Sequence, residues 1–198
     1  SDEPGSAMHI HQSLEDVNGR NLFGTENGGH SELFMHFIAG LQKYTPAVTA
    51  LLAPNVNSYR RLTFGESAPR NVQWGVENRT CGLRVPFSEA SARRVENRFA
   101  GADANPYLAL AATLACGYLG MMEKLEPLPE MKSSAYELPY SLPRSLEEAL
   151  SHLEQCEPIK EMLGERFTRA FVAVKRKEYE TYFGVISRWE REFLLLNV

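Results

Sequence analysis

The sequence has few cysteines, no long hydrophobic run and no excess of basic residues. Its three cysteines, an odd number spread along 198 residues, form neither a disulfide framework nor a CxxC metal pair, so we expect a reducing, cytoplasmic location. The longest uncharged apolar stretch, residues 107–122, is too short to cross a membrane and predicts a buried helix. The net charge of −4 gives no general attraction for nucleic acid or for an anionic membrane. We therefore expect no disulfide scaffold, no membrane association and no nucleic-acid partner.

The composition is that of a globular chain with room for one sizeable core. Hydrophobic residues make up 43% of the chain, charged residues 23% and aromatic residues 10%, which excludes wholesale disorder. The chain begins at Ser1 without an initiator methionine, and its early segment MHIHQSL alternates like a strand in the middle of a sheet. We therefore expect the chain to be a piece of a larger protein.

Hydrophobic periodicity and turn residues predict short strands followed by helices. This order is typical of the α+β class, with an antiparallel sheet and flanking helices. From the N-terminus, the predicted elements are a strand at residues 8–11, a turn at 18–19, a strand at 20–23, a helix capped by Ser31, a second short helix starting at Pro46, a loop or flap at 53–69, strands at 71–75, 81–85 and 95–99, a long helix at 106–124, an extended connector at 126–144, and helices from Ser145 to residue 196 broken near Pro158 and Gly164.

Two short segments each place chemically useful side chains on one face of a strand. His9 and His11 lie two residues apart, so both imidazoles point to the same side of the first strand. Glu96 and Arg98 repeat this geometry with a carboxylate and a guanidinium. Taken alone, the histidines are more typical of packing or surface positions, and the second pair fits a cross-strand ion pair. Together the two segments supply an imidazole and a carboxylate that suit a divalent cation.

Residues 60–98 concentrate arginine. The segment contains eight arginines, no lysine and four glutamates, a net charge of +4 against −8 for the rest of the chain. Arginine without lysine indicates a bidentate grip on carboxylate or phosphate groups, although scattered surface ion pairs would give the same composition. Arginines beside a cation site suit phosphoryl transfer, because the charge on the transferred group must be neutralised.

Other uses of these arginines fit the sequence less well. The chain contains no Walker GxxxxGK[ST] motif and no kinase-type glycine-rich loop, which argues against a P-loop or protein-kinase fold. Aromatic residues do not interleave with the arginines as stacking platforms would, which argues against a nucleic-acid reader.

Four ordered motifs resemble the catalytic domain of the glutamine synthetase family: GSAMHIHQSL, NSYRRL, NRTCGLRVP and RRVENRFAGADANPYLA. The resemblance covers residues 5–125, and the ending WEREFLLLNV is most similar to the γ-glutamylpolyamine and γ-glutamylamide synthetase branch. It implies the family's catalytic-domain fold, incomplete here at its N-terminus. Residues 1–125 would carry the sheet and site motifs, residues 126–144 a connector, and residues 145–198 the C-terminal helices.

The same resemblance implies an ATP-dependent ligase that joins glutamate to an amine or to ammonia. Family members use ATP to form γ-glutamyl phosphate, which the amine then attacks, with Mg²⁺ or Mn²⁺ held between the strands. By motif position, the implied roles are cation binding by His9 and Glu96, substrate binding by Gly5, Arg61, Ser67 and Arg98, and nucleotide or phosphate contacts by His11, Ser13, Arg79, Arg84 and Arg94. Arg61, Arg79 and Arg98 are implied to act directly in catalysis.

Two positions depart from the ammonia-using members. Ser67 stands where those enzymes carry the flap glutamate that helps to deprotonate ammonium, and Pro4 stands where they carry an asparagine that contacts glutamate. Glu66 is one residue early, and in an extended loop it would point to the other side. We therefore expect a bulkier primary amine, either a polyamine or a monoamine, as the acceptor. The alternatives are an ordinary glutamine synthetase that uses ammonia and a non-catalytic structural relative.

The resemblance also implies that these 198 residues lack part of the active site. The family's other metal-binding glutamates lie on strands that precede Gly5, and its active site borrows a domain from a neighbouring subunit. Two protein ligands hold magnesium weakly, because the ion prefers several oxygens in octahedral order. We therefore expect this chain alone to be inactive and the full-length protein to form a homo-oligomeric ring.

Overall fold

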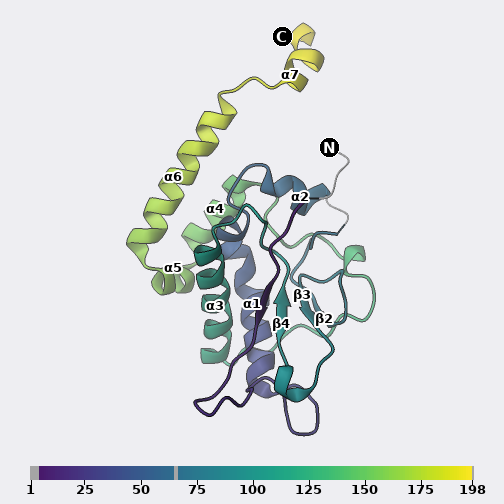
Figure 1. The fold of residues 1–198 in the computed structure, drawn as a ribbon. Coiled ribbons are helices and arrows are strands. Elements are labelled where there is room, and N and C mark those ends of the chain that lie inside the picture. Colours follow the sequence, from purple (N-terminus) through teal and green to yellow (C-terminus); the bar gives the residue numbers. More distant parts are fainter. Residues whose placement is uncertain (1–4, 65–66, 198) are drawn as a thin grey trace.

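The computed structural model describes residues 5–64 and 67–197, which form a four-stranded sheet beside a layer of helices (Figure 1). Pro4 and Glu66 lie outside the described residues. The strands are β1 (Ile10–Gln12), β2 (Trp74–Val76), β3 (Leu83–Val85) and β4 (Val95–Asn97). The helices are α1 (Glu32–Leu52), α2 (Ser58–Phe64), α3 (Pro106–Met122), α4 (Leu146–Gln155), α5 (Glu157–Leu163), α6 (Glu165–Phe183) and α7 (Arg188–Phe193), with short 3₁₀ turns η1 (Ala90–Ala92), η2 (Ala135–Glu137) and η3 (Leu195–Asn197). The α+β prediction is confirmed.

The sheet has the order β1-β4-β3-β2, and it is mixed rather than antiparallel throughout. Strand β4 pairs antiparallel with β1 and β3, as expected, whereas β2 and β3 run parallel with Trp74 opposite Leu83. Parallel neighbours usually need a connection of about a dozen residues or more. Here each strand has only three residues, so the six residues between Val76 and Leu83 are enough to return the chain to the start of the next strand.

Helix α1 is longer than the sequence predicted. Ser31 caps it as expected, because its hydroxyl accepts a hydrogen bond from the Phe34 amide. The prediction of a second helix starting at Pro46 is wrong, since α1 continues through this residue to Leu52. The helix is buried on several sides, including Thr45 at 0% exposure, and this packing holds it together despite the missing N–H of the proline.

The segment at residues 53–69 contains a helix where the sequence predicted a loop. Tyr59 and Leu62 are both buried, and their spacing puts them on one face of α2. At residues 20–23 the predicted strand is absent from the described chain. Isolated bridges occur there instead: Glu15 pairs with Asn21 around a turn in which Gly19 has a φ of 78°, and Gly24 pairs with His30 around a turn in which Gly28 has a φ of 81°.

Helix α3 starts as predicted, with Asn105 accepting hydrogen bonds from the first amides and Pro106 in the first turn. The expectation that it is buried is wrong for one of its faces. Tyr107 is 82% exposed and Met122 64% exposed, while Ala109 and Cys116 on the other side are fully buried. Because the helix is apolar on all sides, its periodicity could not show which face the rest of the fold covers.

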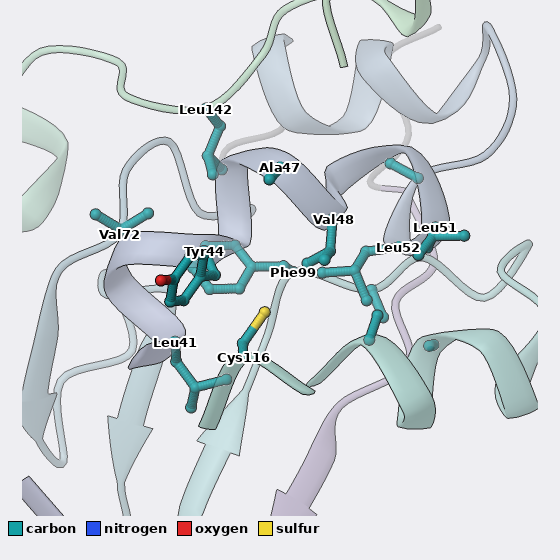
Figure 2. Close-up of a cluster of buried hydrophobic side chains, with 14 of the residues drawn as sticks. Leu41, Tyr44, Ala47, Val48, Leu51, Leu52, Val72, Phe99, Cys116 and Leu142 are labelled. Carbon is teal, nitrogen blue, oxygen red and sulfur yellow. The ribbon is translucent and has the colours of Figure 1, made fainter. Parts of the chain in front are cut away.

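The core lies between α1, α3 and the sheet (Figure 2). Phe99, which follows β4, is 2% exposed and lies among side chains of α1 and next to Cys116 of α3. Val72 and Leu142 join the same cluster from outside the helices, so the connector is anchored to the core. The core therefore fixes the chain directly after β4, the strand that carries Glu96.

The C-terminal part is helical, as predicted, with breaks at Cys156 and Gly164. Ser145 caps α4, because its hydroxyl accepts from the Glu148 amide. Residues 126–144 form an extended connector apart from the turn η2. Helix α6 leads away from the sheet and carries α7 beyond its far end (Figure 1). Among the described residues, no helix is long and apolar enough to cross a membrane.

The closest approach of α1 and α3 occurs at two glycines, and it generates a prediction about stability. A Cβ at Gly40 would lie 2.2 Å from the Cys116 carbonyl oxygen and 2.7 Å from the Gly120 Cα, both of which are backbone atoms. We expect Gly40→Ala to lower the free energy of unfolding by about 1–3 kcal/mol, because the helices must move apart. Denaturant unfolding of the protein that contains this chain measures the change.

Gly184→Ala is the matched control for this substitution. Its Cβ would meet its nearest neighbour at 3.5 Å, and its φ of −73° is ordinary for alanine. We expect a change within about 0.5 kcal/mol. Equal effects of the two alanines would contradict the close helix contact.

Candidate active site

The site is built around Glu96 on β4, which pairs with β1 on one side and β3 on the other. The sheet register places His11 of β1 and Arg84 of β3 directly opposite Glu96. Residues opposite each other on neighbouring strands point to the same face, so the three side chains form a row across the sheet. The alternation predicted for β1 and for β3 is confirmed by burial of Ile10, Leu83 and Val85 on the other face.

The Glu96 carboxylate is 3% exposed and contacts side chains from three strand segments. Its Oε1 lies 2.8 Å from His9 Nδ1, 3.4 Å from Arg98 Nη1 and 4.0 Å from His11 Nε2. Its Oε2 accepts from Arg84 Nη1 at 2.7 Å. The expected proximity of His9 and Glu96, and of Glu96 and Arg98, is therefore confirmed.

This environment controls the charge of both groups in the contact. Burial alone would raise the pKa of Glu96, but the hydrogen bond from Arg84 and the charge of Arg98 outweigh it, so the pKa lies below its usual range. Burial and the Arg98 charge lower the pKa of His9, against the opposing effect of Glu96. At neutral pH the site therefore presents a carboxylate beside a neutral imidazole, and these are the protonation states in which both groups bind a cation.

Two neighbouring arginines are held in place by contacts at the edge of the cluster. Arg84 donates to Glu77 Oε2 at 2.7 Å as well as to Glu96, and hydrogen bonds to Glu77 and then Glu96 raise its pKa. Arg94 donates from Nε to His11 Nδ1 at 3.3 Å. Arg94 and His11, which the motif comparison assigned to the nucleotide, are thus brought together on the same side of the sheet.

Arg61 reaches the site from a different element, the last turn of α2. Its Nη2 donates to the Phe99 carbonyl oxygen, next to Arg98 along the chain. Burial lowers the pKa of Arg61, and the nearby Asp103 carboxylate opposes this effect. Gly5 packs on the Arg61 side chain so closely that a Cβ there would lie 2.8 Å from its Cγ. The structure therefore brings together Gly5, Arg61 and Arg98, the three positions expected to contact glutamate.

The site arginines keep hydrogen-bonding capacity that the described protein atoms do not use. The buried Nε atoms of Arg61, Arg84 and Arg98 have no hydrogen-bond partner within residues 5–64 and 67–197. A buried guanidine donor without an acceptor costs free energy, so an anionic ligand that accepts from it is favoured.

Three predicted site residues are not brought into contact with this cluster. Ser13, Ser67 and Arg79 are all exposed, and none of their side chains has a hydrogen bond or ion pair within the described chain. Arg79 lies near enough to Glu77 for its charge to lower the pKa of that carboxyl, after the larger effects of the Phe87 amide and Arg84.

Sequence reasoning missed two residues that organise the site. Glu77 fixes Arg84, but its role depends on the parallel pairing of β2 and β3, which the sequence did not predict. Arg93 belongs to the arginine-rich segment and yet serves the scaffold, because its Nη2 donates to the carbonyl oxygens of Gly28 and Ser88. A local signal for Arg93 was available, since it falls on the opposite face of the strand from Arg94 and Glu96.

The donor set fits one part of a divalent-cation site. His9 and Glu96 provide one nitrogen and a carboxylate at hydrogen-bonding distance, the ligand types that magnesium or manganese sites accept alongside water and phosphate. In the described part of the chain, no group of three or more His, Cys, Asp or Glu side chains could hold a metal ion. A complete site would need further oxygen ligands.

Comparison with known proteins agrees with this geometry. The model of the glutamine synthetase catalytic domain matches residues 1–194. The chain is 42% identical over 193 residues to the glutamine synthetase of Pyrococcus abyssi, covering 93% of this chain and 43% of that protein. It is 38% identical over 196 residues to the γ-glutamylputrescine synthetase of Escherichia coli K12, covering 98% of this chain and 41% of that protein.

A solved structure shares the fold as well. The ligand-free structure of GmaS has a TM-score of 0.85 and 32% identity, over 96% of this chain and 45% of that one. This chain thus spans less than half the length of the relatives it matches. The match to nearly every residue, together with the shared fold, shows that the chain belongs to the glutamine synthetase catalytic-domain family.

Proposed function

We propose that this chain is part of an ATP-dependent ligase that forms a γ-glutamyl amide from glutamate and an amine by way of γ-glutamyl phosphate. The observation that carries the proposal is the buried carboxylate of Glu96, which His9, Arg84 and Arg98 all contact. Membership of a family whose named relatives include glutamine synthetases and a γ-glutamylputrescine synthetase supports the reaction class.

In this proposal the arginines neutralise the negative charges of the glutamate substrate and of the ATP phosphates. Arg61 and Arg98 hold the glutamate substrate beside Gly5. Because Gly5 has no side chain, its backbone can lie close to Arg61 and to the substrate. Arg84 and Arg94 face the phosphates of ATP with His11, and Arg79 and Ser13 join them when nucleotide binds. A carboxylate attacks the γ-phosphoryl group only where fixed positive charge offsets the repulsion between the two anions.

His9 and Glu96 would hold one divalent cation, Mg²⁺ or Mn²⁺, next to these phosphates. Such an ion supplies charge neutralisation of the phosphate oxygens. The neutral imidazole and ionised carboxylate favoured by the site are ready to bind it. Because further ligands are required, we expect the 198 residues alone to be inactive, and all activity measurements below use the full-length protein.

The remaining assignments of the proposal concern organisation. Residues 1–125 carry the sheet and site motifs, residues 126–144 the connector and residues 145–198 the C-terminal helices of the family's catalytic domain. The full-length protein would act as a homo-oligomeric ring in the cytoplasm. The match to less than half of each relative's length supports the idea of a longer protein.

For the acceptor we propose a polyamine or a monoamine rather than ammonia. Ser67 is an exposed hydroxyl at the place of the flap glutamate of ammonia-using members, and it cannot attract a small cation as a carboxylate does. The glutamine synthetases among the relatives favour ammonia as the second candidate.

A kinetic comparison of acceptors tests the proposed reaction. The full-length protein with ATP, glutamate and Mg²⁺ should form γ-glutamyl amides from putrescine, spermidine or simple alkylamines with a higher kcat/KM than glutamine from ammonium, because Ser67 offers no carboxylate to trap the small ion. The products are measured by mass spectrometry. A strong preference for ammonium would favour the second candidate, and no product with any acceptor would favour a non-catalytic relative.

Substitution at Ser67 tests the basis of acceptor choice. We expect Ser67→Glu to raise kcat/KM for ammonium about tenfold, because a carboxylate there attracts ammonium and accepts its proton. Ser67→Gln is the matched control, since it has the same size without the charge and should give no gain. Equal values for ammonium in wild type and Ser67→Glu would show that this residue does not discriminate between acceptors.

Removal of the Glu96 charge tests the cation site. We expect Glu96→Gln to reduce kcat roughly 100-fold and to raise the Mg²⁺ concentration needed for half-maximal activity, because the site loses its ionised ligand. Glu147→Gln removes the carboxylate of the distant ion pair with Arg176, at 3.2 Å, and should leave both quantities unchanged. Activity within threefold of wild type in Glu96→Gln would contradict the assignment, with thermal unfolding as the check that the variant is folded.

A further inference from the structure

Hydrogen bonds join the chain that follows Ser67 to the connector at residues 126–144. Ser141 contributes two hydrogen bonds, in which its amide donates to the Arg70 carbonyl oxygen at 3.1 Å and its hydroxyl accepts from the Val72 amide at 3.1 Å. Val72 is 9% exposed and lies in the core cluster near Leu142, the next residue of the connector (Figure 2). Residues 70–72 therefore have a fixed position, and Ser67 lies only three residues before them.

The side chain of Arg70 makes a second connection to the same connector. Its guanidinium lies 5.0 Å from the ring centroid of Tyr136 and 5.6 Å from that of Tyr140. Its Nε is buried and has no hydrogen-bond partner in the described part of the chain, where Arg70 forms no ion pair. The attraction between the cation and the two aromatic faces is therefore what holds this guanidinium.

Tyr140 contacts both α2 and Arg70, which follows Ser67 in the chain. Its hydroxyl donates to the Thr63 carbonyl oxygen at 2.7 Å, in the last turn of α2, while its ring packs against Arg70. Thr63 lies two residues after Arg61 on that helix. Tyr136 in turn lies close enough to Arg98 for this charge to act on its pKa, which burial raises. The connector thus links the chain that follows Ser67 to α2, the helix that carries Arg61.

We propose that Arg70 and Tyr140 form a clamp that fixes residues 67–72 relative to α2 and its Arg61, and that this clamp positions the acceptor side of the site. The inference rests on the proposed function, in which Ser67 faces the amine. A segment that is already fixed loses no further conformational freedom when the amine binds, whereas a loose one must be ordered first. Both residues are positioning residues, because neither contacts the reacting groups.

Substitution of Arg70 in the full-length protein tests the clamp. Arg70→Met keeps the length of the side chain and removes the cation. We expect the KM for the amine to rise about fivefold, while kcat and the KM for glutamate stay within twofold. Hydrogen exchange at the Val72 amide should become about fivefold faster, and this reports on the clamp independently of any activity. Arg70→Lys keeps a cation at this position, so both the amine KM and the Val72 exchange rate should change less than in Arg70→Met.

Arg144→Met is the matched control. The Arg144 guanidinium also stacks on the Tyr140 ring, at 5.0 Å from its centroid, but Arg144 belongs to the connector and holds no part of the Ser67 segment. We expect its KM for the amine and its Val72 exchange to stay within twofold of wild type. Tyr140→Phe removes the hydroxyl bonded to Thr63 and keeps the ring, so it should speed exchange at Val72 less than Arg70→Met does.

The outcomes separate the clamp from the proposed reaction. Faster exchange at the Val72 amide and a higher amine KM in Arg70→Met, with neither change in Arg144→Met, would support the proposal. Unchanged exchange would overturn the clamp, and faster exchange with an unchanged amine KM would overturn its role in acceptor binding. If the wild-type protein used no acceptor, the proposed reaction and the clamp's role in acceptor binding would both be wrong, and the exchange measurement would still decide whether the clamp exists.

Discussion

The structure depends on a carboxylate that is almost completely removed from water. An isolated charge in this position would be strongly unfavourable, and loss of one partner from a buried ion pair costs about 3–5 kcal/mol. Glu96 avoids this cost because Arg84, Arg98 and His9 all contact it, each from a different position in the sheet. The register that pairs the strands is therefore also what assembles the site, and a slip of one residue would turn these side chains to opposite faces.

The scaffold and the site share residues rather than merely lying next to each other. Phe99 fills the space over Gly82, where a Cβ would lie 2.1 Å from its ring, and it packs into the helical core (Figure 2). Its carbonyl oxygen accepts a hydrogen bond from Arg61. The core thus fixes Phe99, which follows Arg98 in the chain and accepts a hydrogen bond from Arg61, so the packing of α1 and α3 also supports these two arginines.

The relatives include a glutamine synthetase and a γ-glutamylputrescine synthetase, and our proposal divides the molecule into two parts in a matching way. The row centred on Glu96 comes from regular strands and a buried network, and our proposal assigns the phosphate chemistry to it. The acceptor side in our proposal comes from the segment around Ser67 and from the connector. Loops supported by a rigid framework change with little effect on the rest of a fold. In our proposal this division lets the acceptor side change while the phosphate side stays the same.

The sequence by itself determined the local features of this protein: the alternation that puts His9 and His11 on the same side of the first strand segment, the cap at Ser31, and the family to which the motifs belong. Each depends on residues close together in the chain or on a pattern read directly. Only the tertiary structure decided the parallel pairing of β2 with β3, the continuation of α1 through Pro46, and the contact of Glu77 with Arg84. These outcomes depend on contacts between distant segments, because burial and long-range hydrogen bonds outweigh local preference, and no short stretch of sequence contains that information.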